Sequence, residues 1–188
     1  FRFKTQGLFF LSPVKDAFMS RLRIPGGVLK TYQVREIAKA AGELTSGYIQ
    51  ITTRANLQVR LIEPKHAPEF LERIQGCGLH TRGAGADNIR NLTCNPTAGI
   101  DPAELIDVLP YVREIGQLII AHREFYNMPR KFNIAFDGGG LIGSVEDTND
   151  LGARAVKVVE NDEGIAPGIY FRIAAGGATG HKAFAADV

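Results

Sequence analysis

Basic residues stand one or two at a time in four short segments that also contain β-branched or aromatic residues, proline or glycine. These segments are RLRIPGG with Arg21 and Arg23, TTRANLQ with Arg54, NIRNLTCNP with Arg90, and MPRKFN with Arg130 and Lys131. Charges on a solvated surface do not need such neighbours, whereas arginine and lysine donors are well suited to hold carboxylates and oxyanions. We therefore expect these side chains to converge on one anionic ligand.

The composition excludes simpler explanations of these cations. The chain has 188 residues, a net charge of +2 and 45% hydrophobic residues. So small a net charge argues against nucleic-acid or membrane-surface binding, and no apolar run is long enough to span a bilayer. The length allows one domain or two small ones. Because the sequence opens at Phe1 and ends at Val188 after a Gly-rich stretch, we expect a piece of a longer protein.

The cysteines and histidines give no sign of a metal site. Cys77 and Cys94 lack CxxC spacing, and a chain of this size does not depend on disulfides. The four histidines are scattered without HExxH or paired spacing. We expect no metal ligands among these residues and a reducing, cytoplasmic compartment.

The first part of the chain has the order strand, helix, strand, strand, helix, strand. Alternating apolar residues predict the strands, and apolar runs of helical period after Thr31 and Pro68 predict the helices. The expected strands are residues 18–24, 48–53, 57–62 and 79–81. This order is the split βαβ pattern of ferredoxin-like α/β sandwiches. The sequence thus predicts an α+β fold with a first domain over residues 1–82.

A glycine-spaced junction over residues 82–87 leads to a second domain, residues 83–188. Asp101 and the Pro-Ala-Glu that follows it combine a helix cap, a first-turn proline and a capping glutamate, which predicts a helix start. Pro110 should kink or divide that helix. Strands are expected at residues 131–136, 155–159 and 168–174. We expect a mixed α/β domain that is truncated in this chain.

The four basic segments, in this order, resemble the nitrite and sulfite reductase family, and the resemblance extends over residues 18 to 177. Members of that family carry sirohaem coupled to a [4Fe-4S] cluster. The resemblance implies a ferredoxin-like half domain followed by the N-terminal part of a sirohaem-binding domain. It also implies a parent oxidoreductase of nitrate assimilation, which reduces nitrite to ammonia with six electrons and takes them from ferredoxin.

The resemblance implies roles for individual residues. Those implied around the substrate at the sirohaem iron are Arg23, Arg90 and Lys131, and those implied to contact the carboxylates of the macrocycle are Thr52, Arg54, Gln58 and Arg130. Gly176 and Gly177 match a glycine loop near the same cofactor. Sirohaem carries several carboxylates whose burial needs matching cations, and fixed arginine and lysine donors stabilise the charge that develops on nitrite oxygen.

Asn133 bears on the choice of substrate within the family. Nitrite reductases have asparagine two positions after the lysine that corresponds to Lys131, whereas the sulfite reductases compared with it have a second lysine. Sulfite is a pyramidal anion that can carry close to two charges, and nitrite is a planar monoanion, so one cation fewer suits nitrite. We expect nitrite as substrate. The alternatives are sulfite, reduced to sulfide, or a related tetrapyrrole-modifying oxygenase of the cobalamin pathway.

Several positions depart from the family pattern. Ala55 and Gln50 stand where members often have glutamine and arginine, and Cys94 does not match a cluster ligand. A [4Fe-4S] cluster needs four cysteine thiolates, and the CxxxxxC and CxxxC motifs of the family are absent. We expect the ligands downstream of residue 188, and this chain alone to be inactive.

Two interpretations outside catalysis remain. The chain could be a non-catalytic fragment that binds part of a tetrapyrrole or nothing. It could also be an RNA-binding sheet, but such sheets stack bases on exposed aromatic residues. Residues 48–53 and 57–62 offer only Tyr48 for stacking, so we expect no nucleic-acid partner.

Overall fold

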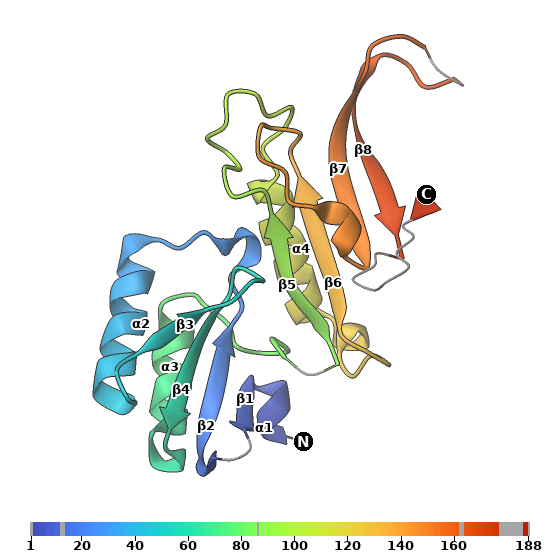
Figure 1. The fold of residues 1–188 in the computed structure, drawn as a ribbon. Helices are drawn as coiled ribbons and strands as arrows, with labels where there is room; N and C mark the ends of the chain where they lie inside the picture. The colour runs from blue at the N-terminus through green and yellow to red at the C-terminus, as the bar shows by residue number, and fades with distance from the viewer. Residues whose placement is uncertain (1, 12–13, 86, 162–163, 177–185, 188) are drawn as a thin grey trace.

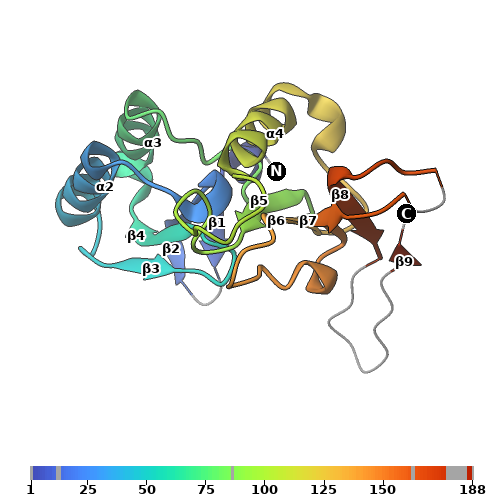
Figure 2. The same cartoon turned by 90° about the horizontal axis from the view of Figure 1, so that it is seen from above.

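The computed structural model describes residues 2–11, 14–85, 87–161, 164–176 and 186–187. It contains two β-sheets that follow one another along the chain and lie side by side (Figure 1). The three longer helices lie along the same side of both sheets (Figure 2). In the described part of the chain, none of the helices has the length and apolar character needed to cross a membrane.

The first sheet is antiparallel throughout, in the order β1-β2-β4-β3. Its strands are β1 (Leu8–Leu11), β2 (Val14–Leu22), β3 (Ile49–Ile51) and β4 (Leu57–Ile62). The helices that cover it are α2 (Thr31–Leu44) and α3 (Ala67–Gly76). Ile37 of α2 and Phe70 of α3 are fully buried in the core between helices and sheet. The predicted α+β arrangement is therefore confirmed for this part.

The last strand expected in this part, residues 79–81, is reduced to one antiparallel bridge between Arg23 and His80. The edge of β2 is already occupied by β1, which pairs Leu8 with Ser20. Sequence reasoning missed β1 because its four residues are all apolar, and a short unbroken apolar run has no period. The fourth strand of the sheet is thus supplied from before β2 and not from after α3.

The second sheet has the order β5-β6-β7-β8-β9. Its strands are β5 (Ile89–Cys94), β6 (Phe132–Asp137), β7 (Leu151–Val158), β8 (Gly168–Ala175) and β9 (Ala186–Asp187). The pairs from β5 to β7 are parallel and those from β7 to β9 antiparallel. Helix α4 (Leu109–Ala121) connects β5 to β6 and buries Val112 and Ile119. Strands were predicted close to β6, β7 and β8, whereas β5 was missed.

The predicted helix start at Asp101 is wrong. Residues 101–108 form turns and bends, and α4 begins at Leu109 with Pro110 in its first turn, so this proline does not divide a helix. The Asp101 carboxylate accepts from the N–H two residues later at 2.9 Å and from the Leu141 N–H at 2.7 Å. Such local side-chain bonds favour a turn over a helix.

The remaining short elements are α1 (Arg2–Thr5) and the 3-10 turns η1 (Pro25–Gly27), η2 (Pro64–His66), η3 (Arg123–Phe125) and η4 (Glu146–Thr148). Each sheet has its own hydrophobic core, and along the chain the first core ends at Leu79 and the second begins at Ile89. The predicted division after residue 82 falls between them and stays a prediction.

The two units meet where η1 packs against α4 and β5. A Cβ atom on Gly116 of α4 would lie 2.7 Å from Cγ of Pro25, so the helix and the turn are in direct backbone-to-ring contact. Asn91 of β5 reinforces the junction, because its Nδ2 donates to the Ile24 carbonyl at 2.6 Å and to the Arg54 carbonyl at 2.9 Å. The relative position of the two sheets is therefore set by close contacts.

Replacing Gly116 with alanine tests this contact. Alanine normally stabilises a helix interior relative to glycine by about 1 kcal/mol. For Gly116→Ala we expect instead a loss of about 1 to 3 kcal/mol in the free energy of unfolding, because the new methyl group overlaps the rigid Pro25 ring. Gly42→Ala in α2 is the matched control, since nothing lies within 4 Å of its Cβ position. Urea unfolding of both variants decides, and equal stabilisation by the two alanines would contradict the expectation.

Candidate functional site

A pocket of about 130 Å³ is lined by residues of both units. The lining residues are Arg21, Arg54, Asn56, Arg90, Lys131 and Asn133. Four of them are cations, the other two are amides, and no carboxylate is among them. A concave surface that combines positive charges in this way attracts an anion.

Different elements bring these side chains together. Arg21 comes from β2, Arg54 from the turn between β3 and β4, and Arg90 from β5. Lys131 immediately precedes β6, and Asn133 lies in that strand. Four of the residues predicted from the sequence, Arg54, Arg90, Lys131 and Asn133, thus share one pocket. Arg21, which was also expected to converge with the other cations, shares it too, although the family resemblance assigned it no individual role.

Two larger pockets adjoin this one. The first, of about 390 Å³, has Arg130, Lys131, Asn133 and Asp150 in its lining. The second, of about 380 Å³, is lined by Arg54 and by residues that include Thr53, Thr93, Cys94, Ser144, Thr148 and Asn149. The three pockets adjoin one another, because each shares lining residues with the others. Together they offer room for a ligand much larger than a small inorganic anion.

Burial and neighbouring positive charges lower the pKa values of two arginines of the pocket. Burial lowers the pKa of Arg21, and the positive charges of Arg90 and Arg60 lower it further. Burial also lowers the pKa of Arg90, with Asp87 opposing and Arg54 adding to the effect. Arginine nevertheless stays charged at neutral pH. The Nε atom of Arg90 is buried without a hydrogen-bond partner in the described structure. An anion in the pocket would relieve both the repulsion and the unpaired donor.

Arg23 lies outside this pocket. Its guanidinium is 2% exposed and donates to four backbone carbonyls. These carbonyls belong to Arg82 at 3.4 Å, Gly83 at 2.8 Å, Ile89 at 2.8 Å and Arg90 at 2.9 Å. Burial lowers its pKa to about 10. The side chain that the sequence predicted at the substrate thus binds the segment that connects the two units.

Thr52 and Gln58 act on neighbouring residues and line none of the three pockets. The Thr52 hydroxyl accepts from the N–H groups of Arg54 at 3.3 Å and Asn56 at 3.1 Å, which stabilises the turn. Gln58 lies opposite Arg21 in the sheet. With its amide oxygen turned to Arg21, it accepts from Nη2 at 2.8 Å and from Nε at 3.2 Å.

Asn133 and Gly176 are linked through Asp150. The backbone N–H and the Nδ2 of Asn133 donate to the Asp150 carboxylate at 2.7 and 3.0 Å. The Asp150 carbonyl in turn accepts from the N–H of Gly176 at 3.0 Å, and Gly176 directly follows β8 with a positive φ of 89°. Gly177, the other predicted glycine, lies outside the described residues.

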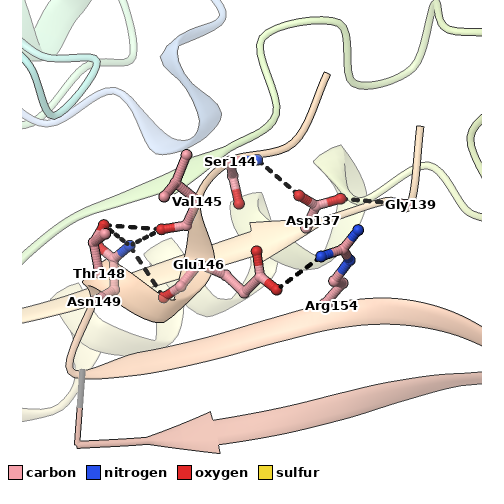
Figure 3. Close-up of polar contacts among 8 residues, drawn as sticks. All are labelled: Asp137, Gly139, Ser144, Val145, Glu146, Thr148, Asn149 and Arg154. Atoms are coloured by element: carbon pink, nitrogen blue, oxygen red, sulfur yellow. Dashed lines mark hydrogen bonds and ion pairs between the residues drawn. The ribbon is translucent and has the colours of Figure 1, made fainter. Parts of the chain in front are cut away.

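The loop after β6 completes the second larger pocket, and no sequence motif pointed to it. The Asp137 carboxylate accepts from the N–H groups of Gly139 at 2.8 Å and Ser144 at 2.7 Å (Figure 3). Further along, the Asn149 amide oxygen accepts from Nη1 of Arg54. An Asn-Asp pair in a loop is typical of an ordinary turn. No sequence pattern therefore predicted a role for Asn149.

Neither cysteine has the environment of a metal-binding thiolate. Burial raises the pKa of Cys94 to about 11, with nearby carboxylates adding to the effect, and its thiol donates to the Gly26 carbonyl at 3.6 Å. Burial also raises the pKa of Cys77. Among the described residues, no group of three or more His, Cys, Asp or Glu side chains could hold a metal ion.

Two family profiles match the sequence. The nitrite/sulfite reductase ferredoxin-like half domain matches residues 12–77, and the nitrite and sulphite reductase 4Fe-4S domain matches residues 85–187. The chain belongs to the nitrite and sulphite reductase family. The ferredoxin-like fold predicted for the first part is thereby confirmed.

Individual relatives agree with this family. The ferredoxin–nitrite reductase of Synechococcus elongatus is 41% identical over 157 residues, which cover 80% of this chain and 30% of that protein. The assimilatory ferredoxin-dependent nitrite reductase of Haloferax mediterranei is 32% identical over 93% of this chain and 32% of its own length. This chain therefore spans about a third of the relatives that it matches.

Two solved structures share this fold. The NirA protein of Mycobacterium tuberculosis superposes over 98% of this chain and 35% of its own, with a TM-score of 0.79 and 25% identity. The structure of dissimilatory sulfite reductase I (DsrI) superposes over 76% of this chain and 33% of the DsrI chain, with a TM-score of 0.59. At 14% identity, this likeness concerns the fold alone.

Replacing Arg23 with lysine tests its place between the units. Lysine keeps the charge but cannot reach four carbonyls in different directions. We expect the free energy of unfolding to fall by about 2 kcal/mol or more, because buried carbonyls lose charged donors. Arg21→Lys, two residues away on a half-buried side chain, should cost about 1 kcal/mol or less. Urea unfolding of the two variants measures the difference, and equal losses would argue against this position of Arg23.

Proposed function

We propose that this chain forms the anion-binding wall of the sirohaem and nitrite site in an enzyme that reduces nitrite to ammonia with six electrons. The observation that carries the proposal is the pocket with four cations and no carboxylate in its lining. The adjoining pockets, with Arg54 and Arg130, provide further donors for a large polycarboxylate. The names of the relatives, ferredoxin–nitrite reductases, support nitrite as the substrate.

The residues present fit such a group. The negative charge of a polycarboxylate would reduce the repulsion between the pocket cations. Arg54, which lines the smallest pocket and the second larger one, and Arg130, which lines the first larger one, would bind carboxylates of the ring. When bound, sirohaem would supply the iron and the redox chemistry.

The residues of the smallest pocket are assigned to the substrate. Arg21, Arg90 and Lys131 would hold the nitrite oxygens, where negative charge increases during reduction, and would donate hydrogen bonds to them. The geometry favours Arg21 for this role and makes Arg23 a positioning residue that holds the segment before Arg90. Lys131 lines two of the pockets, and in this proposal its ammonium would donate protons towards the anion.

Asn133 supports nitrite over sulfite. Its Nδ2 is bound to the Asp150 carboxylate, so this side of the pocket presents a neutral amide beside Lys131. A lysine here would add the second positive charge that suits sulfite, which is why sulfite reduction is the second candidate. The Asn133 side chain is neutral and does not add that charge.

The cluster and the electron donor remain outside these residues in the proposal. A [4Fe-4S] cluster needs four thiolates, and the chain has two cysteines, both of which have raised pKa values. We infer that the ligands come from a part of the parent protein beyond these 188 residues, that a ferredoxin supplies electrons, and that this chain alone does not turn over nitrite.

The test of this function is steady-state kinetics of the full-length holoenzyme with Arg90→Gln. We expect kcat/KM for nitrite to fall about 100-fold, because a fixed charged donor is removed from the substrate oxygens. Arg113→Gln, an exposed arginine of α4 that lines none of the three pockets, is the matched control and should stay near the wild-type value. The same kcat/KM in both variants would exclude Arg90 from the site.

A further inference from the structure

Two arginines of the pocket are held by neutral amide oxygens. Nη1 of Arg54 donates to the Asn149 amide oxygen. The Gln58 amide oxygen, turned to Arg21, accepts from two of its nitrogens at 2.8 and 3.2 Å. Neither Gln58 nor Asn149 lines the smallest pocket, and Asn149 lines only the second larger one.

The orientation of the Asn149 amide is fixed by its surroundings. The residue is 3% exposed, and its Nδ2 lies 3.3 Å from each of the Val145 and Glu146 carbonyls, to which it donates (Figure 3). Turning the amide over would place its oxygen against two carbonyl oxygens. The oxygen therefore faces Arg54. Glu146, whose carboxylate lies 3.5 Å from Nη1 of Arg154, belongs to the same braced turn.

Elsewhere this protein pairs arginines with carboxylates. Arg73 forms ion pairs with Glu36 and Glu43, and Arg154 forms one with Glu146. Among the side chains that the structure describes, no ion pair involves Arg21, Arg54 or Arg90. Asp87 acts on Arg90 only through its field, without such a contact. The arginines of the pocket therefore differ from Arg73 and Arg154 in having no carboxylate partner among the described side chains.

We propose that Asn149 and Gln58 are positioning residues that orient Arg54 and Arg21 while leaving their positive charge for the anionic ligands of the site, the polycarboxylate included. An amide oxygen directs a guanidinium as a carboxylate does, but it contributes a dipole and no net charge. A carboxylate in the same place would neutralise the arginine and compete with the ligand. This inference rests on the proposed function and adds to it the reason why these two residues are amides.

The isosteric acids test the idea. Asn149→Asp and Gln58→Glu, each in the full chain, should raise the Kd for uroporphyrin, an iron-free tetrapyrrole with several carboxylates, by about tenfold, because each neutralises one pocket cation. The Kd is measured by porphyrin fluorescence at several salt concentrations. The salt dependence of binding should also weaken, since fewer protein charges meet the ligand.

Two further variants separate charge from structure. Gln117→Glu on the exposed side of α4 adds the same charge away from the three pockets and should leave the Kd within about twofold of wild type, because solvent screens it. Asn149→Ala removes the orientation of Arg54 but not its charge, and should keep the wild-type salt dependence. A merely structural role would give Asn149→Asp and Asn149→Ala the same salt dependence.

The outcomes separate this inference from the function on which it rests. If wild type binds the porphyrin and both acidic variants match Gln117→Glu, the inference is overturned while the anion site stands. If wild type does not bind the porphyrin, both this inference and the proposed anion site are overturned. Circular dichroism checks that the variants are folded, and should Asn149→Asp not fold, Gln58→Glu in β4 alone decides.

Discussion

The buried guanidinium of Arg23 is the interaction on which the candidate site depends. It binds carbonyls at both ends of the connection between the two units, including the carbonyl of Arg90 itself. Because Arg21 stands on the strand that leads to Arg23, one short segment places a cation in the pocket and also holds the strand that supplies Arg90. The contact of Gly116 with Pro25 acts at the same junction and limits how far the sheets can shift.

Cations collected in this way repel one another, and among the described side chains none of the three pocket arginines forms an ion pair with a carboxylate. Burial and mutual repulsion lower the pKa values of Arg21 and Arg90, which shows that the charged forms are disfavoured where they stand. Neutral oxygens orient the arginines without cancelling that charge. A site of this kind is stable as part of a larger fold and gains most from an anion that completes it, in keeping with the family to which the chain belongs.

Sequence patterns predicted the elements that follow a simple period and the residues of the basic segments that end in the pocket. The strand over residues 57–62 was predicted with its observed bounds, because its apolar residues alternate with Gln58 and Arg60 and turn residues precede the run. Strand β5 was missed because polar residues interrupt it and are buried by tertiary contacts such as those of Asn91. Arg21 and Arg23 look alike in sequence, and only the position of the connecting segment separates their roles. The contact of Asn149 with Arg54 depends on the conformation of the loop after β6, which no local sequence pattern predicts.

The central claim is that the three adjoining pockets are one anion site. It is tested most directly by a crystal structure of the full-length holoenzyme with nitrite. We expect cofactor carboxylates at hydrogen-bonding distance from Arg54 and Arg130, and nitrite oxygens beside Arg21, Arg90 and Lys131. Protein carboxylates paired with these arginines, and a cofactor bound elsewhere, would contradict it.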